Sequence, residues 1–208
     1  MERLTETLTE DYARGATSPG LSLLVSARMS FAPDTRDRAA RVESLGGALL
    51  EDAPAADMGA GALDAVLGRL DAEDETLPRR IDAGPLPEVV MGAVGTDFAR
   101  IPWRFRLPGV SDYVLDGFPD EKVSLLRARP GAAIPQHTHE GQEATLVLTG
   151  AMEDGGRVFR AGEVSINDES DDHKPRIVGD EICHCLVVMT GDLRFTGRFG
   201  RALNILAE

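Results

Sequence analysis

Three histidines and one glutamate are the residues of this sequence best suited to chemistry at a single point. Residues two apart on a β-strand point to the same face, so His137 and His139 present both imidazoles to one spot. Glu143 follows after a short turn, and His173 comes after a further hairpin. Neutral imidazole nitrogens and a carboxylate oxygen suit Zn, Fe, Mn, Ni or Co. The pattern predicts one divalent metal ion held by His137, His139, Glu143 and His173. We favour zinc, with Fe, Mn or Ni as alternatives, and predict no catalytic residue.

The chain around these residues has the two-residue period of β-strands. Short apolar runs, separated by Gly, Pro and Asp, follow one another at roughly even spacing. They cover residues 123–128, 144–150, 157–166, 184–191 and 193–200. Many short strands at even spacing predict a β-sandwich or barrel of the jelly-roll type.

The first seventy residues have the period of helices instead, with apolar positions recurring at three and four. Helices are expected over residues 21–29, 35–50 and 61–70, after an earlier one near Tyr12. Ser18 followed by Pro19 predicts an N-cap and a first helical residue, and Asp34 is expected to cap the next helix. The fold class is therefore α+β, a small N-terminal helical bundle followed by a C-terminal β-barrel. The domains predicted are a helical module at 1–70, a linker at 71–99 and a barrel domain at 100–208.

Composition excludes several classes of protein. The formal net charge of the 208 residues is -13, which repels phosphate and argues against direct nucleic-acid binding. No apolar run approaches the length of a membrane span. Two cysteines, Cys183 and Cys185, are too few and too close for a disulfide framework. We expect a protein of the cytoplasm that does not bind a membrane.

The metal residues resemble those of the cupins. The spacing G-x5-H-x-H-x3-E-x6-G of the first cupin motif is matched in every fixed residue by Gly131, His137, His139, Glu143 and Gly150. Gly162 and His173 stand at the spacing of the second motif, although Asp168, Ser170 and Ile177 depart from it. The resemblance implies that the predicted barrel is a cupin.

The whole chain resembles the anti-sigma factors of the ChrR type. The similarity runs from TLTEDYARGATSPGLSLLVSARM through RDRAARVESLGGALLED to the cupin stretch VSLLRARPGAAIPQHTHEGQEATLVLTGAMED. It implies that the helices bind an extracytoplasmic-function sigma factor and that the cupin senses an oxidative signal and governs release. A homodimer of this chain is possible, and the sequence does not decide it.

One departure from that family concerns the helices. Its members carry a zinc-binding H-x3-C-x2-C, and the same spacing falls here on Arg28, Ala32 and Thr35, none of which is a zinc ligand. We therefore predict no zinc in the helical module. Its stability is expected to come from contact with the cupin and from apolar packing of Leu21, Leu24, Val25, Val42, Leu45, Leu49 and Leu50.

Two other functions compete with the anti-sigma hypothesis. A cupin metalloenzyme, such as a dioxygenase acting on a small organic substrate, would use the same ligands with positions left open for substrate or oxygen. A metal-binding oligomer with no sensor role is the third. Cys183 and Cys185 share one face of their strand and His184 points the other way, so the thiols are read as buried core groups, with a redox role as the alternative.

Overall fold

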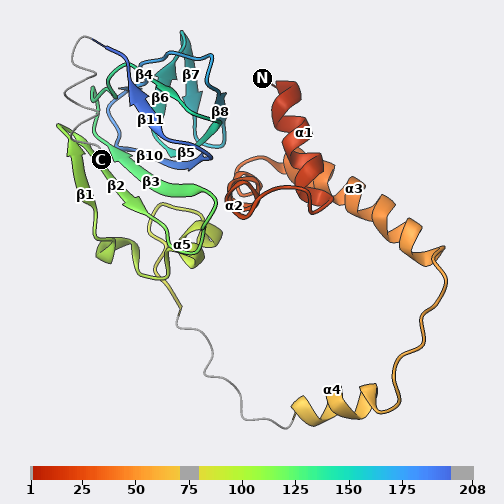
Figure 1. The fold of residues 1–208 in the computed structure, drawn as a ribbon. Coiled ribbons are helices and arrows are strands. Elements are labelled where there is room, and N and C mark those ends of the chain that lie inside the picture. The colour runs from red at the N-terminus through yellow and green to blue at the C-terminus, as the bar shows by residue number, and fades with distance from the viewer. Residues whose placement is uncertain (1, 71–79, 198–208) are drawn as a thin grey trace.

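The computed structural model describes residues 2–70 and 80–197. Helices occupy the N-terminal part and antiparallel strands follow residue 103, which confirms the α+β class (Figure 1). The helices are α1 (Glu2–Ala13), α2 (Pro19–Arg28), α3 (Pro33–Glu51), α4 (Ala62–Leu70) and α5 (Glu88–Val94), with one 3-10 turn at Phe98–Arg100.

The strands form three antiparallel sheets around one interior. The six-stranded sheet, in the order β1-β2-β3-β10-β5-β8, comprises β1 (Arg104–Leu107), β2 (Val110–Val114), β3 (Lys122–Ala128), β10 (Cys183–Met189), β5 (Glu143–Thr149) and β8 (Val164–Asn167). A three-stranded sheet holds β7 (Arg157–Arg160), β6 (Ala151–Asp154) and β9 (Arg176–Val178). The third sheet pairs β11 (Leu193–Phe195) with β4 (His137–His139). Strands are thus present in the predicted runs 123–128, 144–150 and 184–191, while the run 157–166 forms two strands, β7 and β8. In the run 193–200, β11 covers 193–195, and residues 198–200 lie outside the described residues.

Each face of the large sheet has its own apolar cluster, as the two-residue period of a strand requires. Val147, Cys183 and Cys185 lie inside the barrel and pack with Met152 and Phe159 of the three-stranded sheet. Leu146, Leu186 and Val188 belong to the cluster on the outer face, and this cluster includes residues of the helices. Glu143, on the same face of β5 as Val147, therefore lies on the barrel side and the helices on the other.

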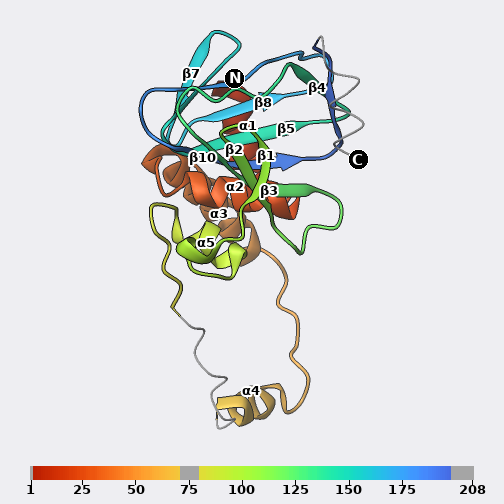
Figure 2. The ribbon, with the colours of Figure 1, turned by 90° about the vertical axis from the view of Figure 1, so that its left-hand side faces the viewer.

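Helices α2 and α5 cover the outer face of the large sheet (Figure 2). Leu24 of α2 and Val90 and Met91 of α5 are fully buried there. At Gly20 the helix lies so close that an added Cβ would come within 2.7 Å of Val123 Cγ2. The first turn of α2 is thus fixed against the sheet by a position that tolerates no larger side chain.

The N-terminal end of α2 also contacts the barrel by hydrogen bonds. Ser18 is the N-cap and Pro19 the first helical residue, as predicted. Glu121, from the connection before β3, accepts hydrogen bonds from Ser18 Oγ and, at 2.7 Å, from Gly20 N. A carboxylate at a helix N-terminus satisfies amide groups that have no partner within the helix.

Helix α3 begins earlier than predicted. Its N-cap is Ala32 with no side-chain cap, and Asp34 lies in the first turn, so the prediction of Asp34 as the cap was wrong. Pro33 explains the shift, because its fixed φ suits the first helical position. Arg38 of α3 pairs with Glu6 at 2.6 Å and with Glu10 at 3.0 Å, both on α1.

The far end of the helical module is exposed. Leu45, Leu49 and Leu50 are 64%, 68% and 76% exposed, so the expectation that they pack the bundle was wrong, whereas Leu24 and Val25 are buried as predicted. The helical period identified an apolar face of α3, but no described segment covers its C-terminal half. Both views show α4 standing apart from the rest of the protein (Figures 1 and 2).

The connection between helices and barrel contains structure of its own. Residues 71–79 of the predicted linker lie outside the described residues, and α5 occupies part of the remainder. The boundaries 1–70, 71–99 and 100–208 stay a prediction. Among the helices of the described residues, none combines the length and apolar character needed to cross a bilayer.

Candidate metal centre

The strand β4 brings two of the predicted metal ligands to one face. His137 and His139 are both buried, with Thr138 between them less so. His173 joins them through the backbone, because His137 N donates to His173 O and His173 N donates to His137 O, each at 3.0 Å. This reciprocal pair sets the imidazoles of His137 and His173 with ring centroids 4.3 Å apart.

The three imidazoles converge. Ring nitrogens of His137, His139 and His173 all lie within 4.8 Å of one another, and all three residues are buried. The Nε2 atoms of His139 and His173 are 2.9 Å apart. Within the described residues, this is the cluster of side chains suited to hold a metal ion.

Hydrogen bonds orient two of these rings. His137 Nδ1 lies 2.8 Å from Pro135 O, and His173 Nδ1 lies 2.7 Å from Asp154 Oδ2. A carbonyl or carboxylate oxygen accepts, so each Nδ1 carries a proton, and in the neutral ring Nε2 keeps its lone pair. This is how metal-binding histidines are commonly held, with the second nitrogen donating to an oxygen.

Asp154 was missed by the sequence analysis. It ends β6 and is only 6% exposed, with its other oxygen, Oδ1, buried and without a hydrogen-bond partner. In the sequence it precedes Gly155 and Gly156, a pattern that indicates a solvent-exposed turn. Only the fold shows that this carboxylate points inward to His173.

Glu143 lies beside the cluster. It begins β5 and is buried, and its Oε2 is 3.7 Å from His139 Nε2. Its Oε1 accepts a hydrogen bond from Thr145 Oγ1 at 3.0 Å. The structure thus brings His137, His139 and His173 together and puts Glu143 next to His139, outside the group of three imidazoles. Glu143 as a fourth ligand stays a prediction.

Burial sets the protonation of these groups. It lowers the pKa of His137 to about 4 and that of His139 to about 4. Burial also raises the pKa of Glu143. For His173 burial opposes the charged form, but the hydrogen bond and the charge of Asp154 outweigh it and the pKa is raised. Neutral His137 and His139 offer the lone pairs that a metal requires.

The residues present fit a divalent metal. His139 Nδ1 is buried with no hydrogen-bond partner, while its Nε2 faces another imidazole nitrogen instead of a protein oxygen. An unsatisfied buried nitrogen is unfavourable unless something else supplies the interaction. Three imidazoles with a carboxylate beside them suit Zn, Fe, Mn or Ni, so the donor set does not fix which metal binds.

The comparisons with known proteins place this geometry in a family. Residues 91–193 match the ChrR cupin-like domain. The anti-sigma-E factor ChrR of Cereibacter sphaeroides is 31% identical over 193 residues, which are 92% of this chain and 91% of that protein. The chain belongs to the ChrR family. A crystal structure of Rhodobacter sphaeroides SigE in complex with the anti-sigma ChrR has a TM-score of 0.75 and 30% identity, over 88% of this chain and 96% of that chain. Both the cupin and the ChrR resemblance seen in the sequence are confirmed.

This ChrR-family chain replaces the expected zinc ligands of its helices with a polar contact. Arg28 ends α2 and Thr35 lies in the first turn of α3, and Arg28 Nη1 donates a hydrogen bond to Thr35 Oγ1. Ala32, the second position of the motif, is the N-cap of α3. None of the three side chains is a zinc ligand. The absence of zinc from the helical module stays a prediction.

The two thiols of this ChrR-family chain lie together inside the barrel. Cys183 and Cys185 are fully buried, with their sulfurs 3.6 Å apart. The hydrogen bond from Cys185 lowers the pKa of Cys183, and the same contact, together with burial, raises the pKa of Cys185. Both sulfurs belong to the apolar cluster of the barrel, as the core interpretation expects.

His184 lies on the opposite face of the same strand. Its ring packs against Phe98 and Trp103, with centroids 5.5 Å and 5.9 Å away. His184 Nδ1 is 2.8 Å from Thr149 Oγ1, and Nε2 is buried without a hydrogen-bond partner. Burial, with Arg127 adding to it, lowers the pKa of His184 to about 4. This histidine fixes the segment before β1 to the sheet and takes no part in the metal cluster.

Proposed function

We propose that this chain is an anti-sigma factor that binds an extracytoplasmic-function sigma factor through the apolar faces of α3 and α4. The observation that carries the proposal is a stripe on α4: Leu63, Val66, Leu67 and Leu70 recur at i, i+3, i+4 and i+7 and are 64%, 58%, 48% and 74% exposed. A stripe with this spacing is the pattern of a helix that packs against another surface.

The C-terminal half of α3 continues this exposed apolar surface. Leu45 and Leu49 are one helical turn apart and so share a face, with Leu50 beside them. Exposed clusters of large apolar side chains commonly mark protein interaction sites. Membership of the ChrR family supports a sigma factor as the occupant, because ChrR of Rhodobacter sphaeroides is seen in complex with SigE.

Substitutions on the stripe test the proposal. An extracytoplasmic-function sigma factor of the same genome is titrated with the wild type, with Leu67→Ser and with Leu49→Ser. Each substitution removes a large apolar contact and should weaken binding at least about tenfold. Phe105→Ser is the matched control, since Phe105 is 73% exposed on β1, outside the stripe. Equal binding by all four proteins would show that the stripe is not the interface.

We further propose that the cupin holds one zinc ion and that its state governs sigma binding. His137, His139 and His173 would hold the ion, with Glu143 as the fourth ligand. When bound, the zinc supplies a positive charge that fixes these side chains in one arrangement. Oxidative loss or rearrangement of the ligands would then alter the cupin and release the sigma factor. Because a sigma factor acts on RNA polymerase, the proposal also puts the chain in the cytoplasm.

A metalloenzyme remains the alternative function for the same ligands. The relation to ChrR over nearly the whole chain favours regulation, because a dioxygenase has no evident use for the helices. Oxygen uptake by the iron-loaded protein with small organic substrates separates the two. Turnover that persists when α3 and α4 carry the Ser substitutions, together with failure to bind any sigma factor, would favour the enzyme.

A further inference from the structure

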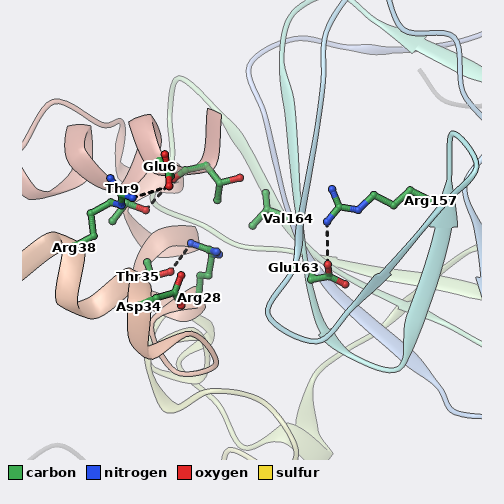
Figure 3. Close-up of a pocket in the computed structure, with 10 residues that line it drawn as sticks. Glu6, Thr9, Arg28, Asp34, Thr35, Arg38, Arg157, Glu163 and Val164 are labelled. Carbon is green, nitrogen blue, oxygen red and sulfur yellow. Dashed lines mark hydrogen bonds and ion pairs between the residues drawn. The ribbon is translucent and has the colours of Figure 1, made fainter. Parts of the chain in front are cut away.

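The junction between the helical module and the cupin contains a cavity of about 320 Å³ (Figure 3). Glu6, Thr9 and Arg38 line it from the helices, and Glu163 and Val164 line it from the cupin. The two sides are therefore separated over the width of this cavity. Contacts at its margin, together with the packing of α2 and α5 on the large sheet, connect the two parts.

Arg28 is at that margin, at the C-terminal end of α2, and its guanidinium contacts both sides. Nη1 donates to Thr35 Oγ1 on α3, and Nε donates to Gly162 O in the turn between β7 and β8, at 3.3 Å. Thr35 is only 2% exposed, so its bond is shielded from water. The planar guanidinium offers several donors in a fixed fork, which is what binding two partners at once requires.

The turn that Arg28 contacts is itself closely fitted to the helices. Gly162 has a φ of +87°, and a Cβ added there would come within 2.6 Å of Phe31 Cβ. Phe31 lies in the short connection between α2 and α3. Glycine at this position therefore permits both the left-handed turn and the close approach.

The turn is also tied to the strand that begins at Glu143. Gly162 N donates to Val147 O at 2.9 Å, and Val147 N donates to Glu163 O at 3.1 Å. Beyond the turn, β8 continues the pairing with β5 as far as Asn167 opposite Glu143. A continuous set of backbone hydrogen bonds thus runs from the Arg28 contact to the edge of the metal cluster.

We propose that the Arg28 guanidinium couples the helical module to the cupin, by bonding α3 at Thr35 and the β7–β8 turn at Gly162 at the same time. Arg28 is a positioning residue in this role. The inference rests on the proposed function in one respect: the coupling matters for regulation because the helices bind the sigma factor. A contiguous contact that both parts can bias is what such coupling needs.

Amide hydrogen exchange of the full chain, with no sigma factor present, tests the contact. Arg28→Met keeps the aliphatic stem and removes both bonds, so exchange should rise about tenfold or more both in the first turns of α3 and at Gly162. Thr35→Val removes only the bond to α3, so exchange should rise there and stay unchanged at Gly162. Arg36→Met is the control for the cupin side, because the Arg36 side chain bonds Met29 O within the helical module, at 2.8 Å, and should leave exchange at Gly162 unchanged.

Arg28→Lys keeps one charged donor without the fork, so it should protect one of the two segments and not both. Wild-type exchange at Gly162 in Arg28→Met, or full protection of both segments in Arg28→Lys, would overturn the proposal. Adding the sigma factor tests sigma binding separately from the Arg28 contact. A wild type that binds no sigma factor refutes the proposed function and leaves the exchange result on Arg28 standing.

Discussion

The arrangement of His137, His139 and His173 predicts what removal of the donors does. The double substitution His137→Ala with His139→Ala takes away two of three converging imidazoles, and no other histidine of the described chain lies in the cluster. We expect metal-free protein, measured as metal per chain by mass spectrometry after purification with zinc. His184→Ala is the control, because that ring lies on the other face of the sheet. Stoichiometric metal in the double variant would refute the assignment.

Asp154 should act on the metal through His173. Asp154→Asn keeps the size of the side chain but removes the charge that holds the Nδ1 proton of His173. Zinc affinity should fall by about 10- to 100-fold, as is usual for carboxylates behind metal-bound histidines. Competition with a zinc chelator measures this. Glu153→Gln, at the preceding position, should leave the affinity unchanged, and an equal loss there would mean a general effect of charge.

His184 should make the stability of the protein depend on pH. Its folded pKa of about 4 lies below the ordinary value of 6.5, so the unfolded chain binds the proton first as pH falls. The contribution of His184 to the free energy of unfolding is fully present above about pH 6.5. It falls by about 3 kcal/mol in total as the pH drops from 6.5 to about 4. His184→Asn, which keeps a donor toward Thr149, should flatten that part of the urea-unfolding profile. An identical pH profile for both proteins would contradict the assignment.

Individual residues also show what the sequence could and could not predict. His137 and His139 were predictable because a two-residue period places both on one face of a strand whatever the rest of the chain does. Asp154 was not, since its role depends on a partner nineteen positions away and its local sequence indicates an exposed turn. Leu45 and Leu49 were misjudged for a related reason. A period identifies the apolar face of a helix but not the surface that covers it.

Among the elements, α1 and α3 are joined by ion pairs between charged side chains. Arg38 contacts both Glu6 and Glu10, yet these side chains are between 32% and 44% exposed, so solvent and salt weaken the pairs. Arg38→Met should therefore destabilise the helical module by about 0.5–1 kcal/mol, with the difference shrinking at high salt. Amide hydrogen exchange of α1 and α3 at increasing urea concentrations measures this loss of stability. A zinc chelator that unfolded α1 and α3 more than Arg38→Met does would refute the absence of zinc there.

Helix α2 belongs to both parts of the protein. Its Leu24 packs in the same cluster as Val123 and Val188 of the large sheet, so separating the helices from the cupin would expose a fully buried leucine. The helical module should accordingly be studied within the full chain. The sequence predicted the helix and its N-cap. The close approach of α2 to the sheet, seen at Gly20, became visible only in the structure.

At the scale of the molecule, metal and sigma factor must influence each other equally if the cupin regulates binding. Whatever factor zinc adds to sigma affinity, the sigma factor must add to zinc affinity, since the two binding events share one thermodynamic cycle. We expect zinc to raise sigma affinity, and sigma to raise zinc affinity, by more than about fivefold, which is the lower end of common coupling between two sites. Titrations of sigma with zinc-loaded and zinc-free protein, and of zinc with and without sigma, measure the two. Factors of one would exclude the cupin as the regulator.

Cys183 and Cys185 test whether the thiols take part in that regulation. Replacing both with Ser leaves the imidazoles in place, so zinc binding and sigma binding should persist. If the thiols only fill the core, release of sigma by an oxidant is unchanged in this variant.

The tether between α3 and α4 has a kinetic consequence. Ten residues separate Glu51 from Ala62, and such a segment spans at most about 35 Å when extended. Two apolar patches on so short a tether bind a common partner as a bivalent ligand, because the second patch is held at high effective concentration once the first has docked. The complex can then open one patch at a time. A competitor that captures the vacated half of the sigma factor would speed dissociation in proportion to its concentration, so the lifetime of the complex would depend on the partners around it as well as on its own affinity.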